Sequence, residues 1–470
     1  MNNDLKRTLN LKDSVSVVIG SMIGCGIFIV SADIARQVET AFLLLVVWLL
    51  AGLFSLSGAI AYAEPVLNIK ENGGQYMFLK KMFNDLTAFL YGWSLLLVIQ
   101  TATIGAVCIA VGKFLGILFP LISSSNYIIQ TLHFNVSMQQ LCALIVCCSL
   151  TYINSRGIKY GVLTQNIFTV TKVLSIAGVI VFGIFFGCNY ETITSNFPYL
   201  LKLSEVFRLL DISFLSNISF STLEIVSTAS VGAIFAMVTW NNITFISAEV
   251  KEPEKNIPLA LLWGVVIVMA LYLLINVLYV CSIPIEQIKT APEDIAAVVL
   301  MQNIAGGAGK VIIVLIILIS ACGSANGLIM TGARVYYQMA KDKLLFEKLA
   351  AVNNKTNVPV NSLVLQCFWS CIFILFCGNY SELLDYVIYA ALIFYVLTAI
   401  GIFVYRFKNK ETSQKRVNSF FAIFFIITGS FIIYSLTVNK FASSMKTFLI
   451  IATGLPIYYA WKNVRAKSYE

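Results

Sequence analysis

The feature that most constrains the fold of this chain is a series of long apolar segments. A helix of about twenty apolar residues can cross a hydrocarbon core about 30 Å thick. The sequence contains about twelve such segments, at residues 13–36, 40–63, 86–112, 138–155, 161–187, 225–248, 257–280, 311–333, 361–377, 386–405, 417–439 and 447–461. Apolar residues make up 59% of the chain and charged residues only 12%, whereas about a quarter of a soluble domain is charged. We therefore predict an all-α integral membrane protein whose residues 1–470 form a single membrane-embedded domain.

The loops differ in charge from one side of the membrane to the other. Of the 32 Lys and Arg residues, only about seven fall in one alternate set of loops, and cytoplasmic loops normally hold the excess. Both termini are therefore predicted to be cytoplasmic, in the plasma membrane. This asymmetry also explains the net charge of +9, so lipid is expected as a partner and nucleic acid is not. Residues 340–354 are expected to form an amphipathic helix on the inner surface.

Cysteine and histidine give no sign of a metal site or cofactor. Most of the 11 Cys residues lie inside apolar segments, without the spacing of metal ligands, and we expect them to be small core residues. The only histidine, His133, lies in a predicted outward loop. Histidine-based metal or acid–base chemistry inside the membrane is therefore not expected, and no metal or cofactor is predicted.

The first apolar segment contains three closely spaced glycines. They are Gly20, Gly24 and Gly26, in the run VVIGSMIGCGIFI at residues 17–29. Glycine allows the chain to leave helical geometry at low cost, but a broken helix survives in lipid only where protein or a water-filled cavity satisfies its freed backbone groups. Glycine spacing alone leaves two interpretations open: a break near residues 21–25, or close packing against a neighbouring helix.

The sixth apolar segment favours a break. Residues 239–242 are Thr, Trp, Asn and Asn, and a polar run inside a membrane helix is expensive and usually functional. Corresponding interruptions in two halves of a transporter point to a midplane binding site built on inverted repeats. The predicted repeats are approximately residues 13–187 and 225–405, followed by two extra C-terminal helices over 417–463.

Several motifs together resemble a known family. They are GSMIGCGIF at 20–28, VVWLLAGLFSLSGAIAYAE at 46–64, ENGGQY at 71–76, FAMVTWNNITFISAEVKEPEKNIPLAL at 235–261 and ACGSANGLIMTGAR at 321–334. The chain is similar over nearly its whole length to the amino acid–polyamine–organocation (APC) superfamily, and within it to the L-type amino-acid transporter (LAT) group. The resemblance implies a LeuT-type 5+5 inverted repeat with about 12 transmembrane helices, in which the first and sixth helices are broken.

The resemblance also implies a substrate site at the two breaks. The N–H groups at the exposed start of a half-helix would bind the substrate carboxylate, and unwound carbonyls would bind the ammonium group. The implied N–H donors are Gly24, Cys25 and Gly26, and the implied carbonyls are near Met22, Phe235, Ala236 and Val238. Phe235 matches the aromatic gate of the family, and a core or lipid-facing Phe is the alternative. Asn241 matches a position that couples the sixth helix to its neighbours, with an ordinary interhelical hydrogen bond as the alternative.

The sequence departs from the family pattern in two places. Cys25 stands where the family often has Ser, and Val238 and Thr239 stand where two glycines are common. Branched side chains at the second place would narrow the pocket or stiffen the break.

Lys172 is the one charged residue in the fifth apolar segment. Such a charge costs at least about 2.5 kcal/mol at the membrane centre and is expected to be paired or functional; snorkelling is the alternative. In the resembled group a lysine here takes the place of a sodium ion. By that resemblance, Lys172 would bridge the first span near Gly20 and the eighth span near Ser324.

These observations favour an alternating-access transporter that exchanges neutral amino acids without sodium. The alternative is proton-coupled symport, in which Lys172 would lose its proton during the cycle. A channel is disfavoured because no filter motif is present, and a membrane-embedded enzyme because no catalytic cluster is present. In the resembled group a cysteine in the outward loop after the third span normally holds a heavy chain, and residues 119–136 contain none, so no obligatory heavy-chain subunit is expected. The choice of amino acid is left open.

Overall fold

The computed structural model describes residues 6–69, 71, 73–130, 135–198, 220–376, 380–409 and 415–467. This part of the chain is almost entirely helical; one pair of antiparallel strands, β1 (Tyr127–Gln130) and β2 (Asn135–Ser137), lies in the predicted outward loop after the third span. Among the described residues, ten helices are long and apolar enough to cross a membrane, or eleven if a bent helix pair counts as one span. The prediction of an all-α membrane protein is confirmed.

The spans follow the predicted apolar segments in order. After the bent pair come α3 (Ala41–Asn68), α5 (Asp85–Ser94) with η1 (Leu95–Ile99) and α6 (Gln100–Leu118), α7 (Met138–Ser155), α8 (Ile158–Phe186), α12 (Phe220–Met237), α14 (Pro253–Ser282), α16 (Ala296–Lys341), α18 (Tyr380–Lys408), α19 (Ser419–Asn439) and α20 (Phe441–Lys467). The ninth predicted segment forms α17 (Val360–Phe376), a shorter apolar helix of 17 residues. Short connecting helices are α4 (Gln75–Met82), α9 (Tyr190–Asn196), α15 (Ile285–Lys289), η3 (Ser247–Glu249), η4 (Pro292–Asp294) and η5 (Glu347–Ala350).

The first span is broken where its glycines predicted. It consists of α1 (Leu11–Met22) and α2 (Gly26–Val38), which meet at a bend of 40°. Asn10 caps the start of α1 in a reciprocal capping box with Asp13. The chain leaves the helix at Ile23, whose backbone is extended. The break therefore occupies residues 23–25.

The sixth span is interrupted more gently than the first. After α12 the chain passes through the 3₁₀ turn η2 (Val238–Asn241) and then the short helix α13 (Asn242–Phe245). A 3₁₀ stretch in the middle of a helix often marks a hinge. The polar run at residues 239–242 thus forms a tightened helical turn, and the backbone there stays hydrogen-bonded while changing its course.

Two predicted segments differ from the structure. The eighth span extends well beyond residues 311–333, because α16 runs from Ala296 to Lys341 with a kink at Ala305 and Gly306. The expected amphipathic helix over 340–354 is wrong. The chain turns after Lys341, where Lys343 has a φ of 57°, and only the four-residue η5 follows. Leu344 and Leu345 are buried, so packing against the protein overrides the helical pattern.

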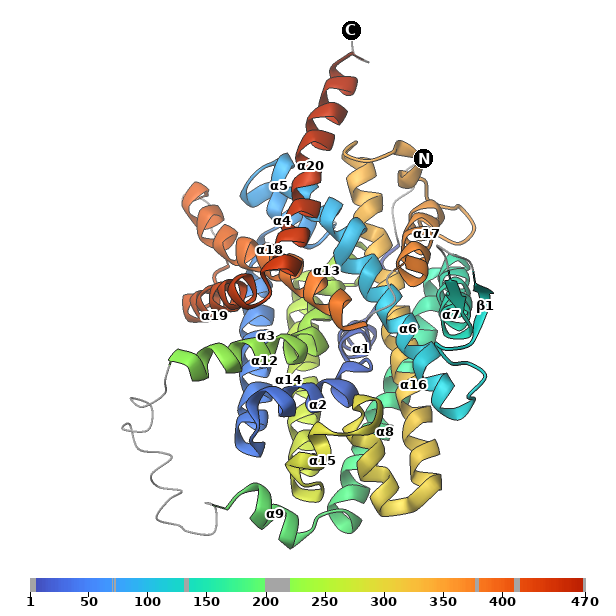
Figure 1. Cartoon of the computed structure of the whole chain (residues 1–470). Coiled ribbons are helices and arrows are strands. Elements are labelled where there is room, and N and C mark those ends of the chain that lie inside the picture. The colour runs from blue at the N-terminus through green and yellow to red at the C-terminus, as the bar shows by residue number, and fades with distance from the viewer. Residues whose placement is uncertain are drawn as a thin grey trace.

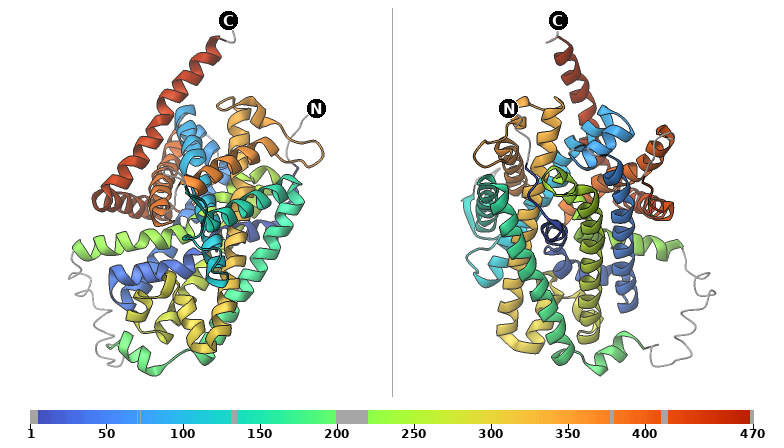
Figure 2. Two further views of the ribbon diagram at one scale, coloured as in Figure 1. Left: turned by 45° about the vertical axis from the view of Figure 1, so that its right-hand side comes forward. Right: turned by 180° about the vertical axis from the view of Figure 1, so that it is seen from behind.

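The broken first span lies at the centre of the molecule. In Figure 1, α1 lies between α14 and α16, and α14, α16 and α8 all pack against it. α12 and α2 run side by side across the molecule in Figures 1 and 2, and they are in contact. Both chain ends lie at the end of the molecule opposite α9 and α15 (Figures 1 and 2).

Candidate functional site

The break in the first span presents the start of a helix to the protein interior. Gly26 is the first residue of α2, and the preceding Cys25 makes no side-chain capping bond. The first N–H groups of a helix have no partners within the helix, and the positive end of the helix dipole lies there. This end of α2 is therefore suited to bind an anionic group such as a carboxylate.

A small cavity lies where the two interrupted spans meet. Its lining comes from the first span, α6, the sixth span and α16: Ser21, Met22, Gly24, Cys25, Gly26, Thr103, Val107, Phe235, Ala236, Thr239 and Ser324. The cavity has a volume of ≈ 20 Å³, which is room for about one water molecule. An amino acid would therefore fit only after the lining groups move apart.

Six of the seven substrate-binding residues predicted from the sequence line this cavity, and Val238 does not. The carbonyl of Val238 instead accepts a hydrogen bond from the hydroxyl of Tyr395 on α18, at 2.7 Å. The neighbouring Thr239 lines the cavity in its place, because the 3₁₀ turn directs Val238 toward α18. Within the described chain, the hydroxyl of Thr239 is buried without a hydrogen-bond partner.

Tyr272 of α14 joins the two interrupted spans. Its hydroxyl lies 3.1 Å from the carbonyl oxygen of Met22 and 3.4 Å from that of Ala236. Two of the predicted ammonium acceptors thus face one buried hydroxyl, and a carbonyl oxygen has a second lone pair for a further donor. Sequence reasoning missed Tyr272. The only available signal was that a tyrosine deep in a membrane span needs a hydrogen-bond partner.

The spacing of the glycines in the first span left two interpretations open, close helix packing and a break, and the structure shows both. A Cβ atom on Gly20 would lie 2.0 Å from Nε2 of Gln165 on α8, so this glycine permits close helix packing. A Cβ atom on Gly26 would lie 2.9 Å from Cβ of Ala236, so the start of α2 closely approaches the sixth span. The break itself lies between them.

Lys172 holds the broken end of α1 through backbone carbonyls. The side chain is fully buried, and its ammonium group donates to Gly20 O and Ile23 O, both at 2.7 Å, and to Ser320 O at 3.3 Å. The contact with the eighth span is thus at Ser320, about one helical turn before the predicted Ser324. Gly323 leaves room for the lysine, since a Cβ atom there would lie 3.0 Å from Nζ.

Two serines of α16 bind the same break. Ser324 donates to Ser21 O at 2.9 Å, and Ser320 lies within hydrogen-bond distance of Ile23 O and Gly24 O, at 3.2 and 3.0 Å. The carbonyls released by the break therefore accept hydrogen bonds from Lys172 and from two hydroxyls, as membrane burial requires. Ser320 was missed from the sequence because a single serine in a membrane helix is common.

Asn241 connects the sixth span to two other elements. Its amide donates to Gln75 of α4 at 2.8 Å, and its Oδ1 lies 2.8 Å from the hydroxyl of Tyr395 of α18. Gln75 in turn donates to Thr398 at 3.1 Å. Shortly after the same span, Glu249 of η3 forms a fully buried ion pair with Arg334 of α16, at 2.8 Å.

Comparison with known proteins identifies similar sequences along the whole chain. Residues 9–460 match a family model described as amino acid permease. The chain is 26% identical over 461 residues to the human large neutral amino acids transporter small subunit 2, covering 97% of this chain and 80% of that protein. It is 28% identical over 471 residues to the serine/threonine exchanger SteT of Bacillus subtilis, covering 99% of both. It is 24% identical to the mouse b(0,+)-type amino acid transporter 1, over 97% of this chain and 88% of that protein.

Proposed function

Because the chain belongs to the amino acid permease family, we propose that it exchanges neutral amino acids by alternating access, without sodium. It is a multi-pass integral membrane transporter, not an enzyme. Exchange is also the activity in the name of the SteT relative, whose length the chain matches almost completely.

The composition of the cavity is the observation that carries this proposal. The end of α2 supplies N–H groups for the substrate carboxylate, and the carbonyls of Met22 and Ala236 supply acceptors for the ammonium group. These groups bind the part that all amino acids share. No acidic or basic side chain is among the residues that line the cavity. A charged substrate side chain would be desolvated there without a partner, which is costly, so neutral substrates are favoured.

The side chains that line the cavity favour small substrates. Thr103 and Val107 of α6 and Thr239 of the sixth span are β-branched residues in a lining that leaves only ≈ 20 Å³, and β-branched side chains adjust little. The unpaired hydroxyl of Thr239 offers a hydrogen bond to a polar side chain. We therefore expect serine, threonine and alanine to be preferred over leucine and phenylalanine.

Lys172 takes the structural role of a bound cation in this proposal. Its ammonium group has three carbonyl partners, which stabilise its charged form and make a sodium ion unnecessary at this place. The second candidate is proton-coupled symport. It is supported by the same complete burial of Lys172, since a buried amine can release its proton.

Counterflow in liposomes separates the two candidates. Vesicles containing the purified chain are preloaded with unlabelled serine, and labelled serine is added outside without sodium or a proton gradient. If the chain is an exchanger, labelled serine accumulates rapidly in preloaded vesicles and does not accumulate in vesicles that were not preloaded. Uptake that requires an imposed inward proton gradient and is indifferent to preloading would replace exchange by symport. Label that never enters, with any amino acid tested, would refute both.

We place the transporter in the plasma membrane with both termini cytoplasmic and acting alone. The loop charges support this orientation. The absence of cysteine from residues 119–136, where the resembled group attaches its heavy chain, supports independence from such a subunit.

A further inference from the structure

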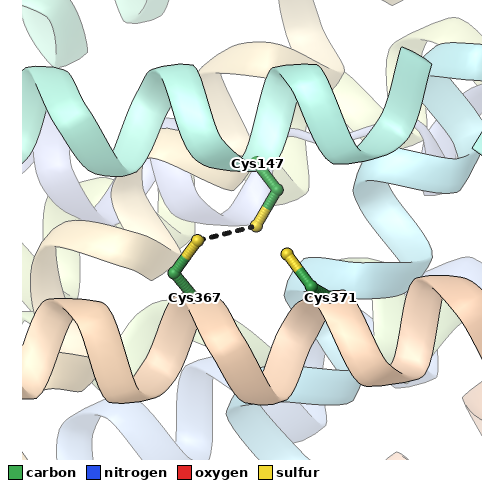
Figure 3. A group of neighbouring side chains, drawn as sticks. All are labelled: Cys147, Cys367 and Cys371. Carbon is green, nitrogen blue, oxygen red and sulfur yellow. Dashed lines mark hydrogen bonds between the residues drawn. The ribbon is translucent and has the colours of Figure 1, made fainter. Parts of the chain in front are cut away.

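Three cysteines from two helices converge on one point in the membrane-embedded region. The three sulfur atoms all lie within 4.8 Å of one another; they belong to Cys147 of α7 and to Cys367 and Cys371 of α17. The Cys147 and Cys367 sulfurs are 4.0 Å apart. In Figure 3 the three side chains point toward one another from the facing helices. Cys147 is completely buried, and the other two are half-buried.

We propose that these three cysteines form a binding site for a soft, divalent metal ion of the closed-shell class that includes Hg²⁺ and Zn²⁺. An ion at the centre of an equilateral triangle of sulfurs 4.0 Å apart would lie about 2.3 Å from each, which equals a typical zinc–thiolate bond. The upper limit of 4.8 Å gives about 2.8 Å, so small side-chain movements suffice. Soft thiolate ligands select soft metals over Mg²⁺ or Ca²⁺.

Electrical neutrality in the membrane decides how many of the three thiols ionise around a divalent ion. Binding converts two thiols to thiolates and releases two protons. When HgCl₂ is the metal source, the two protons leave with two chloride ions. Two thiolates cancel the charge of the ion, and the third sulfur coordinates as a neutral thiol, so the filled site carries no net charge. A divalent ion held by three thiolates would leave a net negative charge, which is costly at this depth.

The position of the cluster also restricts how an ion can reach it. Cys147 lies near the middle of the 18-residue α7, and Cys367 and Cys371 lie in the middle of the 17-residue α17. A hydrated ion pays a large penalty to reach such a depth, whereas HgCl₂ is uncharged. Cys148 is exposed, and its sulfur lies 3.9 Å from that of Cys367, so it is the first thiol on the route from the lipid.

A disulfide is the competing use of these cysteines. The S–S bond is about 2.05 Å long, so Cys147 and Cys367 would have to approach by almost half of their 4.0 Å separation. A disulfide would also leave Cys371 unused. The arrangement of three sulfurs around a common centre favours the metal.

The test uses the full-length chain in lipid nanodiscs, reduced and titrated with HgCl₂. The exposed cysteines Cys148 and Cys188 are first replaced by serine to remove competing thiols. X-ray absorption at the mercury edge then counts the sulfur neighbours of the bound ion. We expect three sulfurs in this background, and two when Cys371→Ser or Cys147→Ser is added.

Cys142→Ser is the matched control, because Cys142 lies on α7 outside the cluster; it is expected to keep three sulfurs. Each variant is compared by size-exclusion elution and by circular dichroism to establish that it is folded. Two sulfurs in the background protein, or a count unchanged by both cluster variants, would overturn the proposal. The disulfide would replace the metal site if Cys147 and Cys367 form a disulfide in air and this bond still blocks mercury binding after mild reduction.

Discussion

At the scale of single residues, the site depends on contacts that tolerate no additional atoms. Gly26 has no side chain because Ala236 of the sixth span lies against it, and Gly323 has none because the ammonium end of Lys172 lies there. Gly26 therefore lets the sixth span approach the break, and Gly323 lets the charged end of Lys172 approach it. This dependence leads to predictions for individual substitutions.

Gly26→Ala should weaken substrate binding sharply. The added methyl group would lie 2.9 Å from Cβ of Ala236, well inside the normal carbon–carbon contact of about 3.5–4.0 Å. Overpacking of this kind costs about 1–3 kcal/mol, which corresponds to roughly a 5- to 150-fold loss of affinity. The loss of affinity is measured by equilibrium binding of labelled serine to the purified variant.

The double variant Gly26→Ala/Ala236→Gly should recover part of this affinity, because it removes the opposing methyl group. Gly178→Ala on α8 is the control, since a Cβ atom there meets nothing within 4 Å. Binding by Gly26→Ala equal to that of the unmodified protein would show that the close approach of α2 to the sixth span is unimportant.

Lys172→Met should abolish exchange. Methionine fills a similar volume but leaves the carbonyls of Gly20, Ile23 and Ser320 without their donor, at about 1–3 kcal/mol for each buried unpaired group. We expect counterflow to fall at least about tenfold, from the same penalty. Gly323→Ala, which keeps the charge but displaces Nζ, should reduce counterflow by a smaller factor. Normal counterflow by Lys172→Met would remove the lysine from the mechanism.

At the scale of helices, the two interruptions are held by hydrogen bonds from different neighbouring helices. The first span is broken over residues 23–25 and is held by hydrogen bonds from α8 and α16. The sixth span turns through η2, which is held from α18 and α4. Thr239 of η2 lines the cavity between the two spans, so the residues that hold η2 should affect stability and transport together.

Tyr395→Phe should destabilise the protein and slow exchange. It removes the hydroxyl that donates to Val238 O and lies 2.8 Å from Oδ1 of Asn241, leaving one buried acceptor unsatisfied at about 1–3 kcal/mol. The thermal unfolding midpoint in a fixed detergent and the rate of serine counterflow are measured on the same sample. Tyr434→Phe is the control, because Tyr434 on α19 is half exposed. If both variants unfold alike, η2 does not depend on the Tyr395 hydroxyl.

At the scale of the whole molecule, both ends of the chain lie at the end opposite α9 and α15 (Figures 1 and 2). Ion pairs support the end that holds the termini: Glu64 at the end of α3 pairs with Arg406 of α18 at 2.6 Å, and Lys80 pairs with Asp342 at 2.7 Å. In the orientation that we propose from the loop charges, this end lies in the cytoplasm and the opposite end faces outward.

This orientation predicts the accessibility of two thiols. Cys188, just before α9, is exposed, and a membrane-impermeant maleimide should label it in intact cells. Lys6→Cys, introduced into a chain with Cys148 and Cys188 replaced by serine, should be labelled only after the cells are permeabilised. Labelling of position 6 from outside would reverse the orientation. Equal labelling of both sites would indicate that the chain inserts in two orientations.

The sequence by itself determined the membrane class, the order of the spans and a break near residues 21–25, which the structure narrows to residues 23–25. These features are local: hydrophobic length, glycine and a polar run act on the segment that contains them. It also pointed to six of the residues that line the cavity, because the two interruptions lie in two short runs of sequence. The repeat boundaries at 13–187 and 225–405 stay a prediction.

Only the tertiary structure decided which distant groups meet. Tyr272 reaches Met22 across 250 positions, Lys172 selects Ser320 rather than Ser324, and Val238 turns away from the cavity toward Tyr395. Cysteines without metal-ligand spacing along the chain converge because α7 packs against α17. Apolar periodicity specifies that a helix is buried, but its rotation and its partners follow from how all the helices pack together, and hydrogen bonds between helices are fixed only then.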